Sequence, residues 1–86
     1  MDYPVLTPAQ LSAHLRSLRK ARGLTQAELG ARLGVNQARV GKIERKPEQV
    51  SVDQLFRLLA ILGARIVLSV PVAGRVSGVR DAPGDW

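Results

Sequence analysis

Apolar residues recur at helical spacing in four successive stretches of the chain, and each stretch follows a residue that favours a helix start. The first follows Thr7-Pro8-Ala9-Gln10, where threonine can be the N-cap, proline takes the first helical position and glutamine closes a capping box. The others follow Thr25, Asn36 and Ser51. The pattern predicts four helices before residue 64. The expected inward-facing positions are Leu11, Leu15, Leu18, Leu29, Leu33, Val35, Val40, Ile43, Leu55, Phe56, Leu59 and Leu62.

Residues 26–43 have the spacing of a helix-turn-helix unit. Two short helices are joined by the turn Gly34-Val35-Asn36, in which Gly34 can adopt left-handed backbone angles. Where the second helix crosses the first, the first must carry a very small side chain, and Gly30 stands there. The apolar positions of both helices then face one core. A helical hairpin of another kind is the alternative.

Residues 64–70, ARIVLSV, form the one run in the chain that is typical of a β-strand. A strand needs a second strand for its backbone donors and acceptors, and nothing else in the sequence obviously supplies one. We therefore predict a homodimer in which this segment pairs antiparallel with its symmetry mate, forming an intersubunit two-stranded sheet. The alternatives are that the segment continues the fourth helix or packs on its own domain. The expected dimerisation residues are Ile66, Val67, Leu68 and Val70.

Residues 71–86 are rich in glycine, proline and small residues, and they keep neither a helical nor a strand period. They are predicted to be a flexible tail, so the chain divides into a helix-turn-helix and dimerisation domain at 1–70 and a tail at 71–86. The protein's single tryptophan, Trp86, ends this tail. Tryptophan on a flexible tether suits a pocket on a partner protein, and packing back on the domain is the alternative.

The charge of the chain indicates a polyanionic partner. Thirteen Lys and Arg against seven Asp and Glu give a net charge of +6. Nine basic and two acidic residues lie between Arg16 and Lys46, so that segment carries 9 − 2 = +7. Such a concentration of positive charge favours nucleic acid. One basic cluster, on the first helix, either borders phosphates or is simply solvated: Arg16, Arg19, Lys20 and Arg22.

Other classes of function find little support in the residues. The chain has no cysteine, so neither disulfides nor a thiolate metal site are expected, and a reducing cytoplasm suits it. No apolar run approaches the roughly 20 residues that span a membrane, and the N-terminus lacks a signal-peptide pattern. The one histidine, His14, has no carboxylate near it in sequence, and there is no phosphate-binding glycine loop. We therefore expect no enzyme, metal, cofactor or small-molecule substrate.

The stretch LTQAELGARLGVNQARVGKIE resembles the Cro/phage-repressor class of helix-turn-helix proteins, over roughly residues 11–62. The resemblance implies a four-helix phage-repressor-like domain whose third helix enters the DNA major groove. Gln37 would pair with adenine, Arg39 with guanine, and Ala38 would contact a thymine methyl group. Gly41 in the recognition helix and Ala38 depart from the class pattern. The phosphate contacts would be Gln26, Arg45 and Lys46. The full implied DNA-binding set is Gln26, Asn36, Gln37, Ala38, Arg39, Lys42, Arg45 and Lys46.

The repressor-like domain, the strand after the fourth helix and the tail ending in tryptophan together resemble the HipB-type antitoxins. The stretches YPVLTPAQLSAHLRSLRKARGLTQ and LFRLLAILGARIVLSV fit that family as well. The resemblance implies a bacterial, cytoplasmic and nucleoid-associated homodimer that binds the palindromic operators of its own operon as an autorepressor. It also implies a HipA-like serine/threonine kinase toxin as partner, with Trp86 as the expected contact. A stand-alone helix-turn-helix transcriptional regulator with no toxin partner is the alternative.

Overall fold

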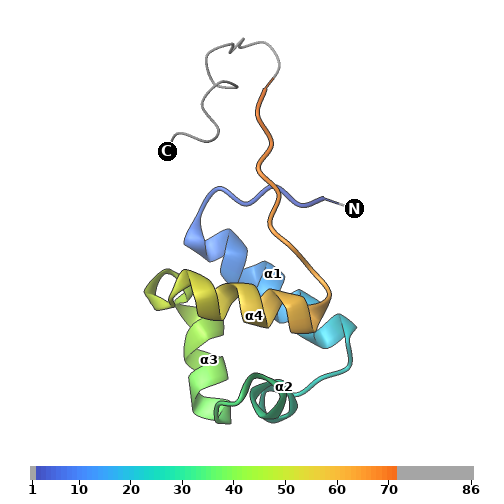
Figure 1. Ribbon diagram of the computed structural model, residues 1–86, viewed down its shortest axis with the longest axis vertical. Helices are drawn as coiled ribbons and strands as arrows, with labels where there is room; N and C mark the ends of the chain where they lie inside the picture. The colour runs from blue at the N-terminus through green and yellow to red at the C-terminus, as the bar shows by residue number, and fades with distance from the viewer. Residues whose placement is uncertain (1, 72–86) are drawn as a thin grey trace.

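The computed structural model describes residues 2–71 as a cluster of four helices from which an extended segment leads away (Figure 1). The helices are α1 (Pro8–Ala21), α2 (Gln26–Leu33), α3 (Gln37–Arg45) and α4 (Val52–Leu62), and a 3₁₀ turn, η1 (Pro47–Gln49), links α3 to α4. The predicted mainly α domain with four helices is confirmed. Within residues 2–71, every helix is too short or too polar to cross a lipid bilayer.

Each helix begins directly after the N-cap residue that the sequence predicted. Each predicted N-cap side chain accepts a hydrogen bond from the N–H of the third helical residue, at 2.8–3.1 Å. At α2 the capping box is complete, because the Thr25 N–H also donates to Glu28 Oε1 at 2.8 Å. The backbone N–H and the hydroxyl of Thr25 lower the pKa of Glu28, so the stability from this contact is lost as pH falls through that lowered pKa. At α1 the expected box is not formed, since Gln10 Oε1 accepts from Leu6 N–H instead.

The core lies where all four helices meet. Two predictions on α4 need correction: Phe56 is 52% exposed, and Leu58, which was not among the expected positions, is fully buried. The inward face of α4 runs through Leu55, Leu58, Leu59 and Leu62 at i, i+3, i+4 and i+7, which turns the adjacent Phe56 outward. The buried apolar side chains are Leu15, Leu29, Val40, Ile43, Leu58, Leu59 and Leu62. Five predicted positions are partly buried against them: Leu11, Leu18, Leu33, Val35 and Leu55.

Helix α4 ends abruptly at Gly63. Its φ is +77°, so the backbone favours glycine, and a Cβ built there would lie 1.7 Å from Nη2 of Arg22, so the end of that side chain would have to move. The Arg22 Nε–H donates to the Leu62 carbonyl at 2.9 Å, and the Ala64 N–H donates to the Leu59 carbonyl at 2.8 Å. These bonds satisfy terminal carbonyls of the helix. The alternative in which residues 64–70 continue α4 is therefore wrong.

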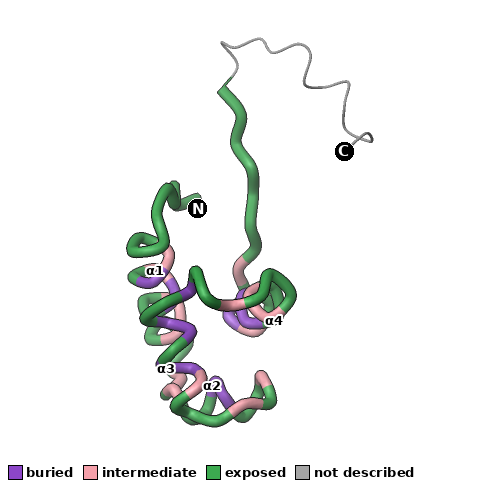
Figure 2. Tube along the Cα trace, turned by 90° about the vertical axis from the view of Figure 1, so that its left-hand side faces the viewer, coloured by how far each residue is buried: buried purple, intermediate pink, exposed green. Residues whose placement is uncertain are grey.

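After Ala64, residues 65–71 run away from the helical cluster and are exposed (Figure 2). The side chains of Ile66, Val67, Leu68 and Val70 are 49–87% exposed, so the segment does not pack on its own domain either. The part of the chain that the structure describes contains no β-strand. A strand between two subunits needs the second subunit, so the intersubunit sheet stays a prediction.

Candidate nucleic-acid interface

The crossing of α2 and α3 depends on two glycines, as the sequence predicted. A Cβ on Gly30 would lie 2.6 Å from the Val35 carbonyl oxygen and 3.2 Å from that of Asn36, so any side chain there would collide with backbone. Gly34 has φ +87°, and its N–H and that of Val35 both donate to the Gly30 carbonyl, at 2.8 and 2.9 Å. These two hydrogen bonds hold the backbone of the turn against α2 at Gly30. This contact sets the steep packing of a helix-turn-helix.

The outer face of α3 is exposed and positively charged. Ala38, Lys42 and Arg45 stand on it at i, i+4 and i+7, while the buried side chains of Val40, Ile43 and Glu44 lie on the other side of the helix. α2 and the start of α3 lie at the end of the molecule opposite to segment 64–71 (Figure 1). Gln37 and Lys46, at the two ends of α3, are exposed as well. These five predicted DNA-binding residues are therefore accessible, and three of them share one face of α3.

Asn36 and Arg39 differ from Ala38, Lys42 and Arg45 because their side chains make hydrogen bonds within the protein. The Asn36 side-chain oxygen accepts the Arg39 N–H at 2.8 Å, so this oxygen serves as the helix cap while the side-chain NH₂ is left to donate to a ligand. Arg39 is partly buried at the flank of α3 that borders α4, where its Nη2 donates to Gln54 Oε1 at 2.7 Å. Gln54 was not among the residues that the sequence singled out.

Gln26 belongs to a polar network beneath the surface. Its Nε2 donates to Glu44 Oε1 at 3.1 Å, and Arg19 Nε donates to Glu44 Oε2 at 2.6 Å. Glu44 is 1% exposed, and Arg19 also donates to the Leu24 carbonyl at 3.0 Å. The network joins α1, α2 and α3, so it holds the first turn of α2 beside α3. A phosphate contact by Gln26 would use the second N–H of its amide.

Gly41 lies beneath two flexible side chains, and it weakens the helix propensity of α3 by about 1 kcal/mol relative to alanine. A Cβ there would lie 3.1 Å from Arg45 Nη1 and 3.7 Å from the amide of Gln26. Glycine therefore allows two predicted DNA-binding side chains to lie close over α3.

The basic cluster of α1 divides between the interior and the surface. Arg19 is paired with Glu44, and Arg22 binds the end of α4 through the Leu62 carbonyl. The Arg19 guanidinium, whose side chain is 11% exposed, therefore fits neither phosphate contact nor plain solvation, whereas Arg22 is exposed and both alternatives stay open for its remaining N–H groups. Lys20 is exposed, and the exposed Arg16 donates to Ser12 Oγ at 2.9 Å. The sequence gives the number of basic residues on α1, but it did not show which of them bind acceptors within the domain.

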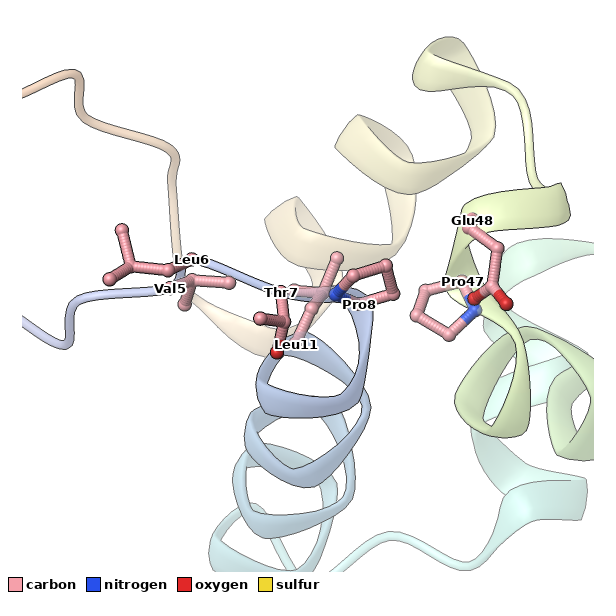
Figure 3. A pocket seen from close by; sticks show the side chains of 7 residues that line it. All are labelled: Val5, Leu6, Thr7, Pro8, Leu11, Pro47 and Glu48. Carbon is pink, nitrogen blue, oxygen red and sulfur yellow. The ribbon is translucent and has the colours of Figure 1, made fainter.

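The described part of the surface has a mainly apolar hollow away from the face of α3. It measures about 220 Å³ and lies between the N-terminal segment and η1 (Figure 3). Its lining is mainly apolar, with Glu48 at the edge: Val5, Leu6, Thr7, Pro8, Leu11, Pro47 and Glu48. His14 packs against Tyr3, with ring centroids 4.9 Å apart. Among residues 2–71, no group of three or more His, Cys, Asp or Glu side chains is placed to hold a metal ion.

Comparison with known proteins agrees with this geometry. The helix-turn-helix family model matches residues 15–68. Antitoxin HipB of Escherichia coli O6:H1 is 30% identical over 64 residues, covering 74% of this chain and 68% of the relative. The chain belongs to the HipB-type antitoxins of the helix-turn-helix family. A second HipB, from Escherichia coli K12, is 28% identical over 64 residues, which cover 74% of this chain and 73% of that protein.

Solved structures of HipB proteins share the fold of this HipB-type chain. One, named as a HipB–O1–O2 complex, has a TM-score of 0.72 and 26% identity, covering 80% of this chain and 100% of the other. Another, named as a HipA–HipB–O2–O3 complex, has the same TM-score and identity and covers 80% and 97%. The predicted resemblance to HipB-type antitoxins is therefore confirmed.

Proposed function

We propose that this chain is a sequence-specific DNA-binding antitoxin that represses its own operon and binds a HipA-like serine/threonine kinase. The observation that carries the DNA-binding part is the exposed face of α3, where Lys42 and Arg45 stand on a helix held by the glycine-dependent turn. The similar structures named as HipB–O1–O2 and HipA–HipB–O2–O3 complexes support both parts. Such a protein would act on the chromosome, in the bacterial cytoplasm at the nucleoid.

In this proposal α3 lies in the major groove. Gln37 pairs with adenine, Arg39 pairs with guanine, and the Ala38 methyl group contacts thymine. Lys42 continues the reading face one turn after Ala38, and the Asn36 amide contacts DNA at the helix start. The groups assigned to phosphates flank this face: Gln26, Arg45 and Lys46.

Two alanine variants separate base reading from phosphate binding. Arg39→Ala is expected to cost about 1–3 kcal/mol on the preferred duplex and to relax the preference at one base pair per half-site. Arg45→Ala should weaken binding to all duplexes alike and lower the salt slope, because a phosphate contact carries no sequence information. Fluorescence anisotropy with duplexes selected from a random library measures both. Identical behaviour of the two variants would contradict this docking.

We propose further that residues 64–70 of two chains pair as an antiparallel ribbon, which forms the homodimer. The backbone of this segment has no strand partner within residues 2–71, and its apolar side chains are exposed. By alternation, Ile66, Leu68 and Val70 share one face, and a two-fold axis brings the same face of both strands together. The dimer places two copies of α3 at half-sites about 34–36 Å apart on a palindromic operator.

A charge placed on the apolar face of the ribbon tests the dimer. Leu68→Asp is expected to weaken dimerisation on the order of 10²-fold or more, because two leucine side chains per dimer lose their burial at about 1.5–3 kcal/mol each. Ser69→Asp, on the opposite face, is the matched control and should leave the dimer largely intact. Sedimentation velocity at micromolar concentration measures both. A monomeric unmodified chain at that concentration would refute the ribbon dimer.

The toxin-binding part rests on the family and on the tail. Residues 72–86 lie outside the described residues, so the division at residues 70 and 71 and the role of Trp86 are proposals from the sequence. A buried tryptophan anchor at a protein interface is commonly worth 2 kcal/mol or more, which is roughly 30-fold in affinity.

Deletion of residues 71–86 tests this role. The truncated chain should keep its DNA affinity and lose about 30-fold or more in affinity for the HipA-like kinase encoded beside its gene. Trp86→Ala should reproduce most of the loss, whereas Val72→Ala is the matched control. Calorimetric titration of the kinase measures each. Equal affinity with and without the tail removes the role of Trp86, and the absence of any such kinase gene favours the stand-alone regulator.

A further inference from the structure

The first turns of α3 and α4 are joined by one side-chain hydrogen bond. Asn36 caps α3 by accepting the N–H of Arg39, and Ser51 caps α4 by accepting the N–H of Gln54. Arg39 and Gln54 are thus equivalent residues, each the third of its helix. Their side chains meet where Arg39 Nη2 donates to Gln54 Oε1 at 2.7 Å. Each end of this contact is attached to a capped, and therefore well-defined, helical turn.

This bond restrains the side chain that the proposed docking uses to read guanine. A free arginine side chain samples many rotamers, and part of this freedom must be lost when the guanidinium binds a base. The bond to Gln54 removes part of this freedom before DNA arrives. The guanidinium has five N–H donors in a planar fork, and the bond to Gln54 occupies one of them. The others still provide a two-donor edge for guanine O6 and N7.

We propose that Gln54 is a specificity-determining positioning residue, which orients Arg39 for base reading without contacting a base itself. The inference rests on the proposed function, because it requires α3 to enter the major groove. It places part of the sequence preference on α4, outside the helix-turn-helix unit. Gln54 is partly buried and its Oε1 faces Arg39, an arrangement that suits support of the arginine more than contact with a phosphate.

The test uses the full chain and the duplex that the unmodified protein selects from a random library. Affinity is measured for this duplex and for versions in which each base pair is changed symmetrically in both half-sites. Gln54→Ala is expected to reduce discrimination at the position read by Arg39 by about 2- to 10-fold, the cost of ordering one long side chain at an interface. Binding to an unrelated duplex should not change.

Three further variants make the result specific. Gln54→Glu keeps an acceptor for Arg39, so it should retain the discrimination while its charge lowers affinity for every duplex. Gln49→Ala, at an exposed position in η1, is the matched control and should match the unmodified protein. In an Arg39→Ala background, Gln54→Ala should have no further effect on discrimination, because the two residues act as one unit.

Three results would overturn the inference, each in a distinguishable way. If Arg39→Ala relaxes the preference but Gln54→Ala weakens all duplexes equally, Gln54 contacts the phosphate backbone and does not position Arg39. If discrimination rises in Gln54→Ala, the bond holds Arg39 away from the base. If Arg39→Ala leaves binding unchanged, the proposed docking of α3 fails, and the role of Gln54 fails with it.

Discussion

Replacing Glu44 by alanine is expected to lower the free energy of unfolding by about 3–5 kcal/mol. The carboxylate is 1% exposed and accepts hydrogen bonds from Arg19 Nε at 2.6 Å, Arg19 Nη2 at 3.4 Å and Gln26 Nε2 at 3.1 Å. Without it, the guanidinium of Arg19, whose side chain is 11% exposed, stays in the interior with no counter-ion. The stability of a small domain is typically about 5–15 kcal/mol, so this loss would leave little reserve.

Urea denaturation monitored by circular dichroism measures the change, with the midpoint expected to fall at a constant m-value. Asp53→Ala is the matched control, because it breaks an ion pair with Arg57 in which both side chains are 68–76% exposed. It should change stability by less than about 1 kcal/mol. Equal effects of the two substitutions would show that Glu44 is not held as described.

A double variant distinguishes the destabilisation caused by an unpaired buried charge from the stabilisation that the ion pair itself contributes. Arg19→Met combined with Glu44→Leu removes both charges and fills the space with apolar groups. It is expected to be clearly more stable than Glu44→Ala, because apolar replacement of a whole buried ion pair is often neutral or stabilising. If it is equally unstable, the additional bonds to Leu24 and Gln26 contribute more than the charges do.

The affinity of the proposed dimer for DNA is expected to fall on the order of 10³- to 10⁵-fold between about 50 and 200 mM salt, if this dimer neutralises roughly 6–10 phosphates. Each chain carries a net charge of +6, and Lys42, Arg45 and Lys46 are exposed on or beside α3. Neutralising phosphates releases condensed counter-ions, so each contact adds about 0.9 to the slope of log affinity against log salt concentration.

Anisotropy titrations at four or more salt concentrations give this slope. Lys46→Ala removes one proposed phosphate contact per chain and should reduce the slope by about 2 per dimer. Arg65→Ala removes the same charge from the exposed segment that follows α4, outside the proposed DNA-binding set, and it should leave the slope nearly unchanged. A slope that responds equally to both would show that net charge, and not the face of α3, governs binding.

Local features were predictable because they depend on a few neighbouring residues. Caps form between residues three apart, and Thr25 and Glu28 showed their capping box in the sequence itself. Gly30 and Gly34 were predictable for a similar reason, since the turn between two short helices permits few arrangements. These features led directly to the face of α3 and to the helix-turn-helix family.

Contacts between helices were harder to predict, and the polar ones hardest. The sequence presented Glu44 as one of two acids opposing a basic segment, although its position four residues after Val40 and one after Ile43 put it on the buried face of α3. Phe56 was expected in the core and Leu58 was not, but the structure exposes Phe56 and buries Leu58. The sequence left this open because the run LFRLL has four apolar residues among five, which allows more than one inward face. Only the packed neighbours of α4 decide which of these faces is covered.

The sequence by itself determined the four helices, their caps, the turn at Gly34 and the membership of a DNA-binding family, because each depends on interactions within a few residues of the chain. The tertiary structure alone decided that Arg19 and Arg22 bind internal acceptors, that Glu44 is buried and that Arg39 meets Gln54. Long polar side chains have many rotamers and can reach several partners. Their partners are therefore selected by how the helices pack, which local sequence does not encode.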